Sequence, residues 1–311
     1  MHGDRLPSVQ TGVALVMVLW VISLMSIMAG SFALSTQREA SIMSHAHERA
    51  KAVALAEGGV NYAMIMLSLP DTQLRWQADG TPYVWQLDGA RVHIRILDES
   101  GKVDINAVQE PTLKAILKLA LGNEDQAAQL TDAILDWRDA DDLKHTQGAE
   151  AEDYKARQMK TLPQNRNFLI MEELQSVMGM TPALYRTLLP WFTLYTGTDG
   201  LNPAKASREI LLKLMNGDLA AVDQYIQQRR QGPTGVPPAL PSLPGMPAGG
   251  GGGSGDMAYT IEALAEIEGQ RRQGVVTTVR RGGAQGIPFT TLRWKPYTPP
   301  PEPEPQPDRH G

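Results

Sequence analysis

Carboxylate side chains gather in the middle of the chain in a pattern that suits a hard divalent cation. Between positions 98 and 153 the sequence carries fourteen Asp or Glu residues against five Lys or Arg. The densest part comprises Asp136, Asp139, Asp141 and Asp142, followed after a short polar loop by Glu150, Glu152 and Asp153. Carboxylates converging from a helix end and the loop after it repel one another, and a cation with six to eight oxygen ligands relieves that repulsion. Calcium is the natural candidate, and a solvated acidic face is the alternative, since the spacing is not that of an EF-hand.

Other patterns of chemically active residues are weak. Cysteine is absent, and the six histidines are not arranged as in a metalloprotease or beside a nucleophile motif, so we expect no enzyme. Residues 174–182 resemble half of a helix-hairpin-helix, a motif that binds DNA phosphates, but Glu172 and Glu173 precede them. The net charge of −5 also argues against nucleic acid as a partner, because phosphate binding requires a basic face.

One segment is built to cross a membrane. Residues 13–34 carry no charge, and 22 residues at about 1.5 Å each reach about 33 Å, enough for a hydrocarbon core of roughly 30 Å. A cleaved secretory signal is the alternative, but the apolar run is long for one and no Ala-x-Ala site follows closely. Charge does not decide the orientation, because Arg5 precedes the span while Arg38, Arg49 and Lys51 follow it.

The helix is predicted to continue beyond the membrane. Apolar residues recur at spacings of three, four and seven between positions 42 and 67, there is no proline from 35 to 69, and Pro70 supplies a stop. Gly58 and Gly59 in the outer half each cost about 1 kcal/mol relative to Ala, so they indicate a close contact or a bend.

Strands are predicted on both sides of a helical block. Alternating apolar residues around the Asp88-Gly89 turn predict a hairpin over residues 83–96. Residues 259–268, 275–280 and 289–294 are three further candidate strands, the first chosen over a helix because its apolar residues alternate. Between them, five short amphipathic helices are expected over residues 112–121, 124–137, 171–178, 182–191 and 204–215.

Several motifs together resemble a known family, the K-type minor pseudopilin of type II secretion systems, also called general secretion pathway protein K. A hydrophilic leader ending in Gly12, before an apolar helix, resembles a prepilin-type signal cut between Gly12 and Val13, although Thr11 stands where a basic residue is often found. The other motifs follow in the family's order: Glu99-Ser-Gly-Lys-Val-Asp-Ile-Asn106, Ile134-Leu-Asp-Trp-Arg-Asp-Ala-Asp141, Gly148-Ala-Glu150, Asn167-Phe-Leu-Ile-Met-Glu-Glu-Leu174 and Asn202-Pro-Ala-Lys-Ala-Ser-Arg-Glu-Ile-Leu211.

The resemblance implies an α+β pseudopilin fold, with a long N-terminal transmembrane helix, a small antiparallel sheet and a large inserted all-helical domain. It divides the chain into a leader (1–12), the transmembrane and N-terminal helix (13–69), the first part of the sheet (70–104), the helical domain (105–230), a flexible Pro/Gly linker (231–256), the C-terminal strands (257–297) and a disordered Pro-rich tail (298–311). It further implies calcium bound in the acidic region, for which we select Asp136, Asp139, Asp141, Glu150 and Asp153.

The implied function is assembly. The family lies at the tip of a short periplasmic pseudopilus and primes its formation, so we expect an inner-membrane anchor and a periplasmic body. The expected partners are I- and J-type minor pseudopilins, the major pseudopilin, the prepilin peptidase, which exposes a methylated N-terminus, and the inner-membrane secretion platform. Met17 stands where major pilins carry a glutamate, which suits a subunit with no neighbour above it, though an ordinary membrane helix looks the same. Two other hypotheses remain, a membrane-tethered DNA-capture protein and an unrelated anchored calcium-binding module.

Overall fold

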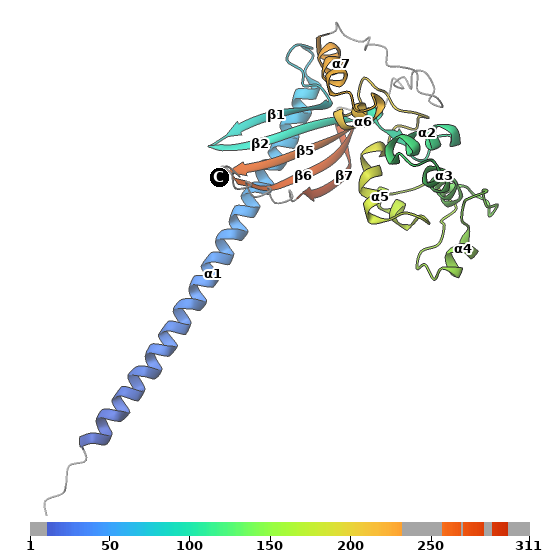
Figure 1. The fold of residues 1–311 in the computed structure, drawn as a ribbon. Helices are drawn as coiled ribbons and strands as arrows, with labels where there is room; N and C mark the ends of the chain where they lie inside the picture. The colour runs from blue at the N-terminus through green and yellow to red at the C-terminus, as the bar shows by residue number, and fades with distance from the viewer. Residues whose placement is uncertain (1–10, 232–256, 269, 283–287, 298–311) are drawn as a thin grey trace, which may run out of the picture.

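The computed structural model describes residues 11–231, 257–268, 270–282 and 288–297. Most of the predicted leader, linker and tail therefore lie outside the described residues. The chain forms a long helix, a five-stranded sheet packed on the outer half of that helix, and a helical domain beside the sheet (Figure 1). The predicted α+β class, with helices between the strands, is confirmed.

Helix α1 (Thr11–Ser68) is a single 58-residue rod. Its first half projects away from the rest of the molecule (Figure 1), and the large apolar side chains from Leu15 to Leu34 are all exposed. Among the described residues, α1 is long enough and apolar enough to cross a membrane. It stops before Pro70, which cannot continue a helix, and the Arg75 side chain donates hydrogen bonds to the carbonyls of Leu69 (2.7 Å) and Pro70 (3.1 Å).

The outer half of α1 packs on the sheet through small residues. Its buried apolar positions follow one helical face: Ala52, Ala56, Val60, Ala63 and Leu67. A Cβ atom on Gly59 would lie 2.7 Å from Val92 Cγ1, and one on Gly58 would lie 3.2 Å from the Trp85 ring. The two glycines therefore mark a close contact between helix and sheet, one of the two alternatives left open by the sequence.

The sheet is antiparallel throughout, with strand order β1-β2-β5-β6-β7. Its strands are β1 (Asp79–Leu87), β2 (Ala90–Asp98), β5 (Ala258–Ile267), β6 (Gln270–Arg281) and β7 (Phe289–Tyr297). Asp88 and Gly89 both have positive φ, 49° and 78°, as a two-residue hairpin turn requires. Ile94 faces Ala263, and Ala263 faces Val275, so these buried residues form one row on the side covered by α1.

The helical domain has its own hydrophobic core, separate from that of the sheet. Its helices are α2 (Glu110–Leu121), α3 (Glu124–Arg138), α4 (Ala151–Ala156), α5 (Pro182–Leu188), α6 (Arg208–Leu214) and α7 (Leu219–Gln231). Short 3-10 turns are η1 (Glu99–Gly101), η2 (Met171–Ser176) and η3 (Leu189–Trp191). Trp137, Tyr154 and Phe192 are its largest fully buried side chains.

Three of the predicted helices need correction. Within residues 171–178 the chain forms the 3-10 turn η2 (Met171–Ser176) instead of an α-helix, and Gly179 follows with φ 85°. The helix predicted over 182–191 ends at Leu188, because Pro190 lies in the turn that follows. The helix predicted from 204 begins at Arg208, where the Ser207 side chain accepts from the amide of Ile210. Helices α4 and α7 were not predicted as such.

The chain enters the helical domain at one narrow place, the neck, and comes back to it before α6 and α7. Two short strands pair there in parallel, β3 (Val103–Asp104) and β4 (Phe192–Thr193). Nearby, the amide of Asn202 donates to the carbonyl of Ser100 at 2.7 Å. A Cβ on Gly101 would lie 2.3 Å from the carbonyl oxygen of Lys205, so the two segments touch backbone to backbone. This neck fixes where the helical domain joins the sheet.

Candidate functional site

Helix α3 carries the predicted acidic residues to the edge of the helical domain. The helix starts after Asn123, whose side chain accepts from the amide of Gln126 at 3.0 Å, and it is held in the core by residues such as Ile134 and Trp137. Asp136 lies in its last turn, and Asp139 is the residue at which it ends. The amphipathic pattern of α3 therefore places the first two carboxylates of the set one turn apart.

Asp136 is completely buried beneath the loop that connects α3 to α4. Its Oδ1 accepts from the amide of His145 at 3.1 Å and also contacts the His145 ring at Nδ1. Its Oδ2 has no hydrogen-bond partner within the described chain. A Cβ on Gly148 would lie only 1.9 Å from that Oδ2, so the loop closes over the carboxylate only because position 148 is glycine.

More carboxylate oxygens around Asp136 are buried without a partner. Among the described residues, Asp139 Oδ1 and both oxygens of Glu150 have no hydrogen bond. Burial, followed by the charges of Asp136 and Asp139, raises the pKa of Glu150 to about 7. Burial also raises the pKa of Asp139, and the charges of Asp141 and Asp136 add to that rise. Unpaired buried oxygens cost free energy unless something satisfies them, so this cluster suits a cation.

Of the five predicted ligands, Asp136 and Asp139 have ligand atoms within 4.8 Å of each other, and Glu150 lies near enough for their charges to raise its pKa. Asp141 is exposed, and its Oδ1 accepts from the amide of Leu143 at 2.8 Å. Asp153 forms an ion pair with Lys144 at 2.9 Å, and this lysine lowers the pKa of Asp153. The other oxygen of Asp153, Oδ2, accepts from the amide of Glu150 at 3.1 Å, so both oxygens of this carboxylate are engaged.

His145 was not among the predicted site residues. One ligand atom from each of Asp136, Asp139 and His145 lies within 4.8 Å of the others. The hydrogen bond with Asp136 raises the pKa of His145. The only sequence signal for it is position, because His145 lies in the loop between the two acidic groups, nine residues after Asp136.

Two other sites suggested by the sequence also have a place in the structure. Gly12 and Val13 lie in the first turn of α1, while residues 1–10 of the predicted leader lie outside the described residues. Just before the half helix-hairpin-helix, Glu172 pairs with Arg293 and Glu173 pairs with Arg166. Negative charge at the start of this motif opposes the approach of a phosphate.

The architecture defines a class of protein. A membrane-length N-terminal helix that packs its outer half on a small antiparallel sheet is the fold of a pseudopilin, here with a helical domain inserted between β2 and β5. A family model described as type II secretion system protein K matches residues 90–197. This match and the relatives below support the assignment of the chain to type II secretion protein K.

Relatives and a solved structure agree with this assignment. The chain is 27% identical to type II secretion system protein K of Pseudomonas aeruginosa over 88% of its own length and 89% of the relative. It is also 27% identical to protein K of Klebsiella pneumoniae, over 71% and 75% of the two chains. Its fold resembles a chain in the GspK-GspI-GspJ complex from enterotoxigenic Escherichia coli, with a TM-score of 0.56 at 16% identity, covering 81% of this chain and 98% of the other.

Proposed function

We propose that this protein is the minor pseudopilin at the tip of the type II secretion pseudopilus, where it primes assembly with I- and J-type minor pseudopilins. The observation that carries the proposal is α1, whose apolar half is exposed and carries no acidic residue. Met17 is 65% exposed at the position where a carboxylate would pair with the N-terminal amine of a neighbouring subunit. An unpaired carboxylate in lipid costs several kcal/mol, so an apolar residue suits a subunit with no neighbour above it.

The shape of the body supports an end position. The helical domain projects sideways from the sheet, on the side away from the rod (Figure 1). A subunit inside a helical stack has neighbours above and below, and a broad body is accommodated most easily at the end of the stack. The similarity to a chain solved with two other proteins of the same secretion system gives the named partners.

Co-purification tests the proposal. The full chain, extracted in detergent, is expected to form a complex with I- and J-type minor pseudopilins from the same organism. Met17→Glu should weaken assembly of this complex into pseudopili, whereas Met25→Glu, at an equally exposed position of the same helix, controls for the mere presence of a charge in the membrane segment. A chain that stays monomeric in the presence of both partners contradicts the proposal.

Processing supplies a second test. The mature chain is expected to begin at a methylated Val13 after cleavage behind Gly12, with α1 in the inner membrane and the body in the periplasm. Gly12→Leu should leave the leader attached, and Gly30→Leu, in open surroundings of the same helix, should not. Mass spectrometry of the N-terminus distinguishes these outcomes, and an intact leader on the native protein refutes prepilin processing.

We also propose that the acidic cluster binds calcium through Asp136, Asp139 and Glu150. Four buried carboxylate oxygens without partners, under a loop that only glycine lets close, fit an oxygen-liganded divalent cation. The ion would neutralise the converging charges and tie the end of α3 to the loop before α4. Asp141 would join only after its side chain leaves the amide of Leu143, and Asp153 only after it leaves Lys144 or the amide of Glu150.

Chelation provides the measurement for calcium. At a calcium concentration a hundred times Kd, removal of the ion should cost about 2.7 kcal/mol of stability, seen as a lower melting temperature. Asp136→Asn should abolish the calcium dependence, while Asp125→Asn, at the exposed start of the same helix, should keep it. A melting temperature that does not respond to chelator leaves a plain acidic surface.

A further inference from the structure

The sheet and the helical domain meet across a boundary without a common core. Among the described residues, the buried apolar side chains of the sheet cluster with α1, and those of the helical domain cluster with one another. A cleft of about 350 Å³ lies between the two bodies, on the face of the sheet opposite α1. Bodies that share no hydrophobic core are expected to move relative to each other. The polar contacts across the boundary therefore decide how the helical domain is held.

A first contact is buried and lies at the edge strand β1. Arg229 of α7 pairs with Asp79 of β1, and only 5% and 7% of the two side chains are exposed. The guanidinium also donates to the backbone carbonyls of Asp79 and Ala206. Because separating a buried ion pair leaves an uncompensated charge, this contact, the pin, is expected to stay closed.

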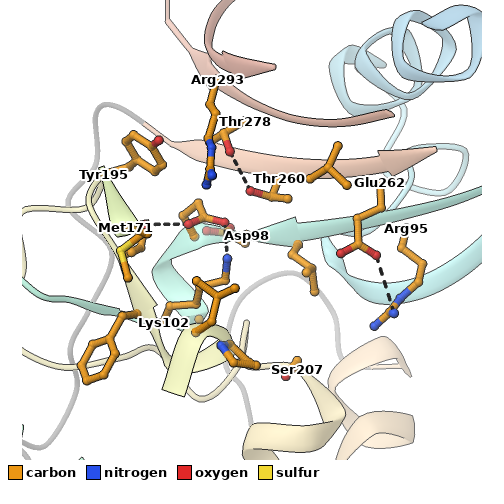
Figure 2. A pocket seen from close by; sticks show the side chains of 18 of the residues that line it. Arg95, Asp98, Lys102, Met171, Tyr195, Ser207, Thr260, Glu262, Thr278 and Arg293 are labelled. Atoms are coloured by element: carbon orange, nitrogen blue, oxygen red, sulfur yellow. Dashed lines mark hydrogen bonds and ion pairs between the residues drawn. The ribbon is translucent and has the colours of Figure 1, made fainter. Parts of the chain in front are cut away.

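A second contact is half exposed and lies at the opposite edge strand, β7. Arg293 of β7 pairs with Glu172 of η2, and 34% and 38% of the two side chains are exposed. Figure 2 shows the Arg293 side chain reaching into the cleft, beside Thr278 and Thr260. Ion pairs that water can reach are weak, and salt screens them. This contact, the latch, therefore opens far more easily than the pin.

The register of the sheet puts the pin and the latch at the two ends of one row. The residues paired along this row, strand by strand, are Asp79, Leu97, Thr260, Thr278 and Arg293. At about 4.8 Å between neighbouring strands, the β7 end of the row lies about 19 Å from the β1 end.

The neck lies close to the pin on this scale, because it follows β2, the strand next to β1. With the pin as pivot, a rotation of about 10° moves the latch by about 3 Å and the neck by about 1 Å. A movement of that size separates the charges of the latch while the backbone at the neck only bends.

We propose that the helical domain is hinged on the sheet, with its pivot at the pin and the neck, and that the ion pair of Arg293 and Glu172 is the latch of this hinge. The structure holds the latch closed. When the latch opens, the helical domain swings away from β7 and the cleft widens, and the few loop residues of the neck absorb the change in backbone angles. The proposal does not rest on the tip position or on calcium.

Distances between spin labels on the full chain in detergent test the hinge. The sequence has no cysteine, so cysteines introduced at exposed positions are the only labelled sites. One pair, Arg186→Cys in α5 with Thr290→Cys in β7, spans the latch, and a second pair, Gln224→Cys in α7 with Gln77→Cys before β1, spans the pin.

Salt should open the latch and spare the pin. Raising NaCl from roughly 0.05 M to roughly 1 M shortens the Debye length to about 3 Å, so the latch distance should grow by about 3 Å or more while the pin distance stays the same. A latch distance that does not respond to salt, or equal changes in both distances, overturns the proposal.

Charge reversal identifies the latch residues. Glu172→Arg and Arg293→Glu, each alone, should lengthen the latch distance at low salt, since each replaces attraction with repulsion. The variant that carries both changes should regain the original distance and its response to salt, because the pair is rebuilt with its charges exchanged. If this double variant stays as open as the single variants, the pair is not the latch.

Glu173→Arg is the matched control. Glu173 is the next residue along the chain, but it pairs with Arg166 at 3.2 Å inside the helical domain. Its reversal changes the net charge as much as Glu172→Arg does and should leave both distances unchanged. A latch distance that grows equally in Glu173→Arg would show that overall charge sets the angle of the helical domain, which contradicts the proposal.

Discussion

Arg229 joins the last helix of the helical domain to the first strand of the sheet, and its removal gives a sharp prediction. The side chain is 5% exposed. Its Nη1 donates to the carbonyl of Ala206 at 2.9 Å, and its Nη2 donates to the carbonyl of Asp79 at 2.8 Å. The same Nη2 lies 3.3 Å from Asp79 Oδ2, and Asp79 is 7% exposed. One guanidinium therefore holds α7, the neck and β1 together.

The expected cost follows from these contacts. Arg229→Met keeps most of the apolar stem but leaves a buried carboxylate and two carbonyls without their donor. Removing one member of a buried ion pair costs about 3–5 kcal/mol. Asp79 Oδ1 still accepts from the amide of Thr81 at 2.9 Å, which retains part of its stabilisation. We therefore expect Arg229→Met to lower the free energy of unfolding by about 3 kcal/mol, the lower end of that range. When Arg229→Met is combined with Asp79→Asn, the loss should be smaller than the sum of the two single losses.

Thermal unfolding of the full chain in detergent measures this loss. For a protein of this size 1 kcal/mol shifts Tm by about 2–4 °C, so Arg229→Met should lower Tm by about 6–12 °C. Arg208→Met is the matched control, since Arg208 also pairs with an aspartate, Asp223, at 2.8 Å, but both side chains are about half exposed. That pair should contribute less than about 1 kcal/mol. Equal shifts in the two variants would refute the reasoning from burial.

Three further outcomes follow from single sites. Gly59→Ala should lower the stability of the body by up to about 2 kcal/mol in urea unfolding, since a clash at 2.7 Å outweighs the gain of about 1 kcal/mol in helix propensity, while Gly30→Ala should not. The hydrogen bond from His93 lowers the pKa of Glu266 below its ordinary 4.5, so its stabilisation is present above that pH and is lost as pH falls below it. Glu266→Gln should therefore flatten the stability profile between pH 5 and 3, and an unchanged profile would contradict this. Gly148→Ala should abolish any effect of chelator on Tm, because the added methyl displaces the buried carboxylate beneath it, and a retained chelator effect would count against the proposed ligands.

The sheet and the long helix were predictable because their signals are strong and local. The Asp88-Gly89 turn fixed the first hairpin, since both residues must take positive φ. In residues 259–268, alternation outweighed the helix propensity of Ala, Leu and Glu, because one face had to be buried beneath α1. The sequence indicated that Gly59 marks either a close contact or a bend in the helix. It did not indicate that β2 is the element packed there.

The elements missed or misplaced are those set by tertiary contacts. Strands β3 and β4 have two residues each, too few for any periodicity. Helix α4 has only six residues, and α6 starts at its Ser207 cap because Asn202 and its neighbours are engaged in the neck. Such choices depend on chain segments that are about a hundred residues apart.

The acidic site was predictable in composition but not in geometry. The sequence predicted that carboxylates would converge after α3, and Asp136, Asp139 and Glu150 do so. The sequence could not show that Lys144 would form an ion pair with Asp153, or that the His145 ring would form a hydrogen bond with Asp136. The conformation of the loop between α3 and α4 decides both contacts. Whether these carboxylates bind a metal stays a prediction.

The neck holds both ends of a long segment of the helical domain at the same place beside the sheet. Because β3 and β4 lie side by side, the segment between them, residues 105–191, returns to the point from which it left, close to the end of β2. The length of that segment can therefore change while its two ends stay in place beside the sheet. A force applied to the helical domain reaches the membrane anchor through the backbone contacts of the neck and through two ion pairs, Arg229 with Asp79 and Arg293 with Glu172.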